Sequence, residues 1–327
     1  MRNIFLNRAI AEAVIKEMEL DPNVVLIGED VVNRGGGMSA FLGVYNKFPE
    51  RCLDMPIAES GYGHFSNGAA LCGLRPVVDF MFSDFLALPF DPIVNGAAKF
   101  HYCSLGKSPV PIVYVAANGG RGTYDGVGSG CNHSQTSEAW FMNVPGLKIV
   151  APYYPEDACG LMRSAIRDND PVLFLYHEGS LGLKQEVPDE INPIPLNRAA
   201  KVLAEGDAAT VVAIQSMVPL AVKAAKQLAE EGIKVDLIDP RVLIPLDIEK
   251  IADSLKKTGK LIIVTEEHTR GSFAGEILRQ LTEMDITMFR KSPKVLGALN
   301  TPIASGYGEA YIMPHTEDIV KAVRDLI

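Results

Sequence analysis

The chain has 327 residues, of which 47% are hydrophobic and 22% charged, and its formal net charge is −9. This composition is typical of a globular protein of about two domains and argues against disorder. An acidic chain without a lysine or arginine cluster is a poor candidate for nucleic-acid binding, and no apolar stretch approaches the length of a membrane span. The five cysteines form no Cys-x-x-Cys pair, and the N-terminus lacks a secretory hydrophobic region. We therefore expect a reduced, cytoplasmic protein with no nucleic-acid or membrane partner.

The first half of the chain alternates helix-like and strand-like segments. Apolar residues at helical spacing predict a helix over 6–20, and a buried strand follows at 24–27. Further strands are predicted at 51–54, 76–80, 111–116, 148–151 and 172–176. Helices are predicted at 60–74, 91–102 and 155–167. The second of these has Asp91 as its expected N-cap and Pro92 at its first helical position.

Prolines among charged residues predict a linker at 188–200, between one domain at 1–187 and another at 201–327. The second domain repeats the alternation. Its predicted strands are 210–214, 234–238, 261–265 and 294–297. Its predicted helices are 219–231, 247–258, 273–281 and a last one capped by Thr316. Apolar strands between helices predict an α/β fold whose mostly parallel sheets are flanked by helices. Ligands in such sheets bind beyond the carboxyl ends of the strands.

A lone carboxylate stands out in the segment 54–61, at a predicted strand-to-helix junction. Glu59 lies there among Ile57, Ala58 and other small residues. A carboxyl group held among apolar residues can exchange a proton with a ring nitrogen near neutral pH. The alternative is that Glu59 only complements the positive end of the following helix. By spacing alone, the helix-end role is favoured.

A histidine follows the glycine-rich run 119–130, in the tetrapeptide Asn-His-Ser-Gln. His133 can serve as a proton donor near neutral pH. The alternative is that it only helps to cap a helix predicted to run through Trp140. The aromatic residues of 80–91 have two interpretations as well: they form core or subunit interface, or one ring packs on a flat heterocycle.

Several segments together resemble one family. They are Asp-x-Pro-Ile-Ala-Glu-x-Gly at 54–61, Ala-x-x-Gly-Leu-Arg-Pro at 70–76, Phe-Asp-x-Ile-x-Asn-x-Ala-Ala-Lys at 90–99, His-Ser-Gln at 133–135, Pro-Gly-Leu-Lys-x-Val at 145–150, Ser-Ala-Ile-Arg-Asp-Asn at 164–169, and Ile-Asp-Pro-Arg with Pro-Leu-Asp at 238–247. The sequence is similar to the β subunits of thiamin-diphosphate-dependent 2-oxoacid dehydrogenases. That family includes the decarboxylating components for pyruvate and branched-chain oxoacids, and the acetoin dehydrogenases.

The resemblance implies a thiamin pyrimidine-binding domain, a transketolase-like C-terminal domain and an α2β2 heterotetramer. It implies that Glu59 binds the pyrimidine N1′ of the cofactor, that Ile57 contributes a backbone contact and that Phe85 packs on the aminopyrimidine. His133 matches the histidine that handles protons on the substrate side. The resemblance further implies a potassium site, formed largely by backbone carbonyls. Its residues are Ile112, Ala165, Ile166, Asp168 and Asp170.

The Gly-Asp-Gly motif that binds diphosphate and magnesium in thiamin enzymes is absent from this chain. In the family it lies on the α chain, so diphosphate and magnesium are expected there. The resemblance also implies transfer of an acyl group to the lipoamide of an acyltransferase core. Leu88 lies where some pyruvate enzymes have a polar residue, and we expect acetoin or a small aliphatic 2-oxoacid as substrate, with acetoin slightly favoured.

Two other functions remain as hypotheses. The chain is then either the C-terminal half of a split transketolase or deoxyxylulose-phosphate synthase, or a catalytically inactive scaffold subunit. Sugar-phosphate substrates would call for a basic cluster, which the sequence does not clearly contain. The presence of Glu59 and His133 argues against an inactive scaffold.

Overall fold

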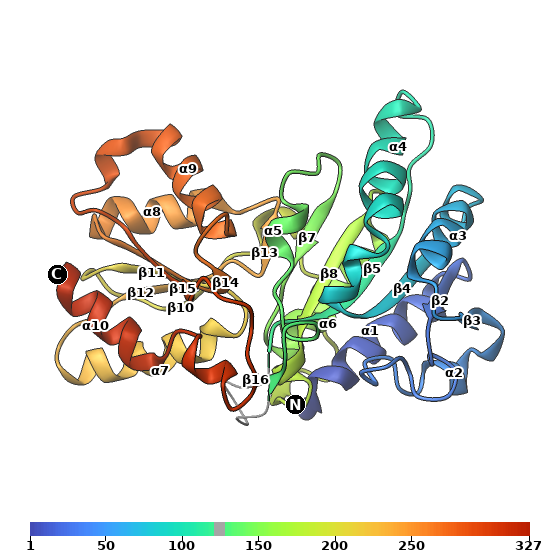
Figure 1. Ribbon diagram of the computed structural model, residues 1–327, viewed down its shortest axis with the longest axis horizontal. Coiled ribbons are helices and arrows are strands. Elements are labelled where there is room, and N and C mark those ends of the chain that lie inside the picture. Colours follow the sequence, from blue (N-terminus) through green and yellow to red (C-terminus); the bar gives the residue numbers. More distant parts are fainter. Residues whose placement is uncertain (121–127) are drawn as a thin grey trace. The chain divides into compact units, whose positions relative to one another are not determined.

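The structure, a computed structural model, describes residues 1–120 and 128–327. It forms two compact units (Figure 1). The first contains Met1–Asn118 and Trp140–Leu196, and the second contains Gly119–Ala139 and Asn197–Ile327. The predicted domain ranges differ from these units chiefly at residues 119–120 and 128–139, which belong to the second unit.

The first unit is built on a parallel sheet with the strand order β7-β8-β5-β4-β2-β3. Every residue of β2, β5 and β8 is buried, as expected for apolar strands covered on both faces. The strands are β2 (Val24–Gly28), β3 (Cys52–Asp54), β4 (Arg75–Phe82), β5 (Val113–Asn118), β7 (Lys148–Val150) and β8 (Val172–His177). A separate antiparallel pair joins β1 (Arg2–Phe5) to β9 (Lys184–Val187).

The first unit also contains helices, several of which pack on its sheet. They are α1 (Leu6–Leu20), α2 (Val44–Lys47), α3 (Glu59–Leu71), α4 (Ala98–Cys103) and α6 (Pro155–Arg167), with α5 (Glu138–Phe141) at the boundary of the two units. The buried Glu17 of α1 accepts hydrogen bonds from Arg163 and Arg167 of α6, each 2.7 Å from Nε to the carboxylate. These charge-assisted bonds join α1 to α6. Removal of either partner would leave an unpaired charge buried, which is strongly destabilising.

The predicted N-cap at Asp91 is wrong. Asp91 has helical backbone angles, and its carboxylate accepts a hydrogen bond from the Asn95 side chain at 2.8 Å. A π-helix, Pro92–Ala97, continues from it into α4. The backbone is therefore already helical before Pro92. An Asp-Pro pair is typical of a helix start, but in this chain it lies within a helical segment.

The second unit has a sheet with the order β10-β12-β11-β14-β15, in which only β10 is antiparallel among the described strands. Its strands are β10 (Lys201–Ala204), β11 (Thr210–Ala213), β12 (Asp236–Asp239), β14 (Leu261–His268) and β15 (Lys294–Ala298). Helices α8 (Ile248–Thr258) and α9 (Phe273–Asp285) cover one face, and α7 (Met217–Glu230) and α10 (Thr316–Leu326) cover the other (Figure 1). Two layers of helices around a parallel sheet confirm the predicted α/β class.

Three short strands complete the second unit. Strand β13 (Val242–Ile244) follows β12, and β16 (Ser305–Gly306) pairs antiparallel with β6 (Gly128–Ser129). The N-cap of α10 is His315 rather than the predicted Thr316, because the His315 backbone amide donates to Asp318 at 2.9 Å in a capping box. Within the described residues, no helix is both long and apolar enough to cross a membrane.

Candidate active site

The carboxyl ends of β2, β3 and β4 meet at one edge of the first sheet. Gly28 at the end of β2 is in register with Asp54 of β3 on one side and with Asp79 of β4 on the other. The backbones approach closely there, since a Cβ on Gly28 would lie 2.9 Å from the Asp79 carbonyl oxygen. Acidic residues from well-separated parts of the chain therefore gather at this edge.

Glu59 is the first residue of α3 and only 7% of its surface is exposed. Its carboxylate forms no hydrogen bond or ion pair with any residue that the structure describes. Its place in the first turn is also where the helix dipole favours a negative charge. Both interpretations of Glu59 therefore remain, but a buried carboxylate without a protein donor is costly unless a ligand supplies one.

Glu29, Tyr62 and Asp79 surround this edge and were not singled out in the sequence. The Tyr62 hydroxyl donates to the Asp79 carbonyl at 3.3 Å, and its ring stacks on Phe80 with the centroids 5.0 Å apart. Burial and the neighbouring Glu59 raise the pKa of Glu29, while a hydrogen bond with Tyr62 opposes that rise. Burial raises the pKa of Asp79 to about 7, against the opposing hydrogen bond from the Met81 amide.

Two of these carboxyl groups keep an oxygen without a partner. Glu29 Oε1 and Asp79 Oδ2 are buried and accept no hydrogen bond within the described part of the chain. Gly36, with φ +84, packs so closely on Asp79 that a Cβ would lie 2.1 Å from Oδ2. Native proteins rarely leave buried oxygens without donors, so this edge is suited to a ligand or ordered water that donates hydrogen bonds.

Three other predicted residues lie in the segments that follow β3 and β4. Phe85 is half-buried in the 3₁₀ helix Ser83–Ala87 that directly follows β4, and its ring meets Phe82 edge-on at 5.5 Å. Ile57 precedes α3 with 83% of its surface exposed, and Leu88 is 57% exposed. Exposed apolar side chains beside buried acids fit a surface that a ligand or another chain covers.

His133 belongs to the second unit. It is half-buried in a turn, and its backbone amide donates to the Gly130 carbonyl at 3.0 Å. Helix α5 begins only at Glu138, so His133 is not the N-cap of that helix. The part of the glycine-rich run at 121–127 lies outside the described residues.

The residues predicted for potassium lie together at the amino ends of β5 and β8. The carbonyl of Ile112 accepts from the Val172 amide at 2.9 Å, and that of Ala165 accepts from the Asp168 amide at 3.2 Å. Arg75 donates to the carbonyls of Ile166 and Asp168, both at 3.0 Å.

The side chains of Asp168 and Asp170 are also paired. Lys148 Nζ lies 2.6 Å from the Asp168 carboxylate, and His101 Nδ1 lies 2.6 Å from that of Asp170. A carbonyl oxygen has two lone pairs, so a carbonyl that accepts one hydrogen bond can also bind a cation. The potassium site stays a prediction.

Sequence reasoning found Glu59 through its apolar neighbours but missed Glu29, Tyr62 and Asp79. One signal for Glu29 was available, because an acidic residue directly follows a fully buried strand. Asp79 gave none, since it lies inside a strand where a single polar residue usually faces solvent.

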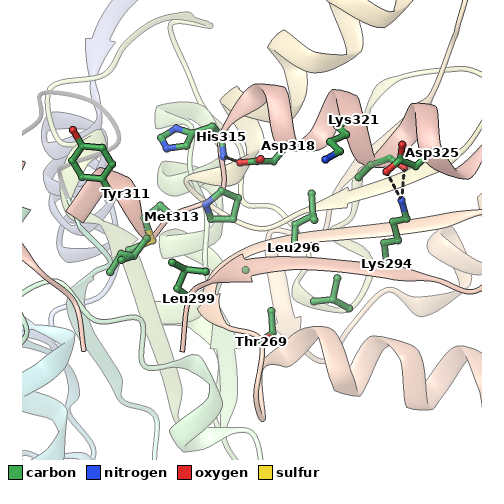
Figure 2. A pocket seen from close by; sticks show the side chains of 15 residues that line it. Thr269, Lys294, Leu296, Leu299, Tyr311, Met313, His315, Asp318, Lys321 and Asp325 are labelled. Atoms are coloured by element: carbon green, nitrogen blue, oxygen red, sulfur yellow. Dashed lines mark hydrogen bonds and ion pairs between the residues drawn. The ribbon is translucent and has the colours of Figure 1, made fainter. Parts of the chain in front are cut away.

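A cavity of about 510 Å³ in the second unit lies between β15 and α10 (Figure 2). Leu296, Leu299 and Met313 line it, and Lys294 pairs with Asp325 at 3.3 Å on its rim. None of the residues predicted from the sequence lines this cavity, so it is not part of the candidate site.

Comparison with known proteins identifies the family. Residues 3–184 match the transketolase pyrimidine-binding domain, and residues 198–319 match the transketolase C-terminal domain. The chain is 36% identical to the β subunit of acetoin:2,6-dichlorophenolindophenol oxidoreductase from Cupriavidus necator, over 99% of this chain and 97% of that protein. It belongs to the β-subunit family of the acetoin and pyruvate dehydrogenases.

Other members of this β-subunit family are similarly related. The acetoin:2,6-dichlorophenolindophenol oxidoreductase β subunit of Bacillus subtilis is 37% identical, over 100% of this chain and 98% of that protein. The mitochondrial β-1 subunit of the pyruvate dehydrogenase E1 component from Arabidopsis thaliana is 38% identical, over 96% of this chain and 86% of that protein. The family's enzymes depend on thiamin diphosphate, and the acetoin and pyruvate branches match this chain about equally well.

Solved structures show the same fold. A split-gene transketolase, described as an inactive β4 tetramer, aligns with a TM-score of 0.78 over 99% of this chain and 98% of that one, at 23% identity. A transketolase variant from Pichia stipitis aligns with a TM-score of 0.70 over 100% of this chain and 46% of that one, at 18% identity. At such identities the likeness supports the fold alone.

Proposed function

We propose that this chain is the β subunit of an α2β2 thiamin-diphosphate-dependent dehydrogenase. The enzyme cleaves acetoin or decarboxylates a small 2-oxoacid and passes the acyl group to the lipoamide of an acyltransferase core. The observation that carries the proposal is the buried Glu59 carboxylate, which has no protein partner among the described residues at the carboxyl edge of the first sheet.

The residues at this edge fit the aminopyrimidine half of the cofactor. Glu59 would hold a proton at N1′, and the exposed backbone at Ile57 would contact the ring on which Phe85 packs. The unpartnered oxygens of Glu29 and Asp79 can accept hydrogen bonds from an amino group or from water. When bound, the cofactor supplies an electron sink for the carbonyl carbon of the substrate.

The remaining functions divide between this chain and an α chain. His133 would move a proton on the substrate side, and Leu88 would contact the alkyl part of the substrate. Because the sequence lacks Gly-Asp-Gly, the α chain would bind magnesium and the diphosphate. We therefore expect the isolated β chain to be inactive and to bind thiamin diphosphate weakly, and tight magnesium-dependent binding by this chain alone would contradict the assignment.

The decisive experiment is purification of the chain with the α chain that accompanies it, followed by steady-state kinetics on acetoin, pyruvate and 2-oxoisovalerate. Activity on any of these substrates with a lipoyl acceptor supports the proposal. Activity only with an aldose phosphate would support a split transketolase instead, and none at all would support a scaffold.

The same panel tests the substrate preference. An apolar Leu88 favours alkyl bulk by roughly 1–3 kcal/mol per methylene at most. We expect acetoin to be preferred slightly, and Leu88→Gln to shift the preference towards pyruvate by about tenfold or less. A strong preference for pyruvate that Leu88→Gln leaves unchanged would show that Leu88 does not contact the substrate.

A further inference from the structure

The segment that carries His133 is held by residues from distant parts of the second unit. Strand β6, just before this histidine, pairs with β16, in the register Gly128 with Gly306 and Ser129 with Ser305. The Ser129 amide also donates to the Ser134 hydroxyl at 3.1 Å, directly after His133. Both sides of the histidine are thereby tied to neighbouring backbone.

Two consecutive buried glutamates near the end of β14 accept hydrogen bonds from the backbone before and after the His133 segment. Glu266 accepts from the Gly120 amide at 2.7 Å through Oε1, and its other oxygen accepts from the Ser216 hydroxyl. Glu267 accepts from the Ala139 amide at 3.1 Å and from the Phe273 amide, at the start of α9, at 2.7 Å. One glutamate therefore holds the backbone thirteen residues before His133, and the other holds it six residues after.

A third carboxyl group lies between two glycines of the segment. Glu309 is fully buried, and a Cβ on Gly120 would lie 2.0 Å from its Oε1. A Cβ on Gly128 would lie 2.0 Å from its Oε2. Only glycine allows the backbone to approach the Glu309 carboxyl group this closely at both positions.

Stability alone does not account for these three acids. Burying carboxyl groups costs free energy, and apolar side chains of similar volume often stabilise a fold as well or better. The cost is visible at Glu267, whose pKa burial raises to about 7 despite its two backbone donors. What the carboxylates of Glu266 and Glu267 provide, and apolar residues cannot, is strong directional acceptance of backbone N–H groups.

We propose that Glu266 and Glu267, through their hydrogen bonds, and Glu309, through its close packing against Gly120 and Gly128, are positioning residues for the backbone on both sides of His133. This inference rests on the proposed function for its catalytic meaning, because it assigns the three acids to the placing of a proton-transferring histidine. Their effect on the reaction is exerted through His133, and they do not touch the substrate.

The first test is hydrogen exchange of the full β chain, measured on peptides that cover residues 128–139. We expect Glu266→Ala to accelerate exchange there by about tenfold or more while the peptides of β14 stay protected. Glu266→Gln should have a smaller effect, since its amide oxygen can still accept from Gly120. Glu283→Gln, on the exposed face of α9, is the matched control and should change nothing.

Gly128→Ala tests the Glu309 contact in the same way, because the added Cβ would meet the carboxyl group. Gly275→Ala is its control, since nothing lies within 4 Å of a Cβ there. Unchanged exchange over 128–139 in both Glu266→Ala and Gly128→Ala would overturn the proposal. If Glu266→Ala failed to fold, unchanged exchange in Gly128→Ala would overturn it alone.

The second test uses the reconstituted α2β2 enzyme and separates this inference from the proposed function. Glu266→Gln should lower kcat with little change in the KM for substrate, and it should cost nothing further in a His133→Ala background. Additive losses would overturn the positioning role. If His133→Ala alone left turnover intact, the proposed role of His133 would fail, while the exchange experiment would still decide whether the acids hold the segment.

Discussion

Both units place buried acids at the carboxyl edge of a mostly parallel sheet. In the first unit, Glu29 and Asp79 each keep one oxygen that no described residue satisfies, and Glu59 has no described partner at all. In the second, Glu266 and Glu267 accept hydrogen bonds from the amides of Gly120, Ala139 and Phe273. Glu29, Asp79 and Glu59 thus have oxygens available to a ligand, whereas Glu266 and Glu267 are occupied by backbone amides.

The difference lies in the supply of donors. Where backbone amides of a loop or a helix start lie close to the carboxyl ends of the strands, a carboxylate accepts their hydrogen bonds and holds that backbone in place. Where small residues such as Gly28 and Gly36 bring the backbone close without offering a donor, the carboxylates remain acceptors for something else. Four predictions test this contrast, from the largest expected effect to the smallest.

Glu59→Gln in the reconstituted enzyme should lower turnover by about a hundredfold or more, because glutamine keeps the size but cannot exchange a proton. Steady-state kinetics at saturating cofactor provide the measurement. Glu50→Gln, an exposed glutamate of the same unit, is the control. Near-normal turnover would mean that Glu59 only complements the positive end of α3 and does not take part in proton transfer.

His133→Ala should lower turnover by at least about tenfold and leave cofactor affinity nearly unchanged, since its proposed role is proton transfer on the substrate side. Turnover and thiamin diphosphate titrations of the same preparation test both parts. A collapse of cofactor binding with the saturated rate preserved would show that the histidine serves the cofactor and not the substrate.

Asp79→Asn should flatten the pH dependence of stability. The pKa of Asp79 is raised to about 7 in the fold, so the folded chain keeps a proton that the unfolded chain loses from about pH 4 upwards. Stability therefore falls with rising pH over that window, by no more than about 4 kcal/mol. Asparagine cannot ionise and can still accept from the Met81 amide, so the variant should be the more stable form above pH 7.

Urea unfolding of the β chain from pH 5 to pH 8 measures the Asp79 effect. The control is Asp236→Asn in the second unit, where burial raises the pKa but hydrogen bonds from Lys257, Gly206 and Ser254 lower it overall. That variant should instead lose stability above about pH 4. Parallel pH profiles for wild type and Asp79→Asn would mean that Asp79 has a donor after all.

The smallest expected effect is at the amino ends of β5 and β8, where four of the five predicted potassium residues have carbonyls that already accept a hydrogen bond. Potassium chloride should raise the Tm of the β chain by a few degrees relative to choline chloride at equal ionic strength. Arg75→Lys, which keeps the charge but loses the planar guanidinium whose Nη1 donates to both carbonyls and whose Nη2 donates to Asn169, should reduce the difference. Equal Tm values in potassium chloride and choline chloride would contradict the predicted potassium site.

The sequence alone determined the local structure and the family. Helix α6 and the described parallel strands of both sheets follow from apolar periodicity and end signals that lie within a few residues of one another, whereas the antiparallel β10 was not predicted. The family followed from motifs that are contiguous in the chain, and so did the interest in Glu59 and His133. The Asp91 and Thr316 caps failed because the first turn of a helix depends on where the preceding chain arrives, which the neighbouring residues do not specify.

Only the tertiary structure decided which acids act together. Glu29, Glu59 and Asp79 are separated by 20 to 50 residues in the chain, and they meet because parallel strands align their carboxyl ends. The backbone around His133 meets Glu266, Glu267 and Glu309 from more than a hundred residues away in the chain. Whether a buried carboxylate receives a donor depends on such distant backbone, so no local pattern could separate the ligand-facing acids from the anchoring ones.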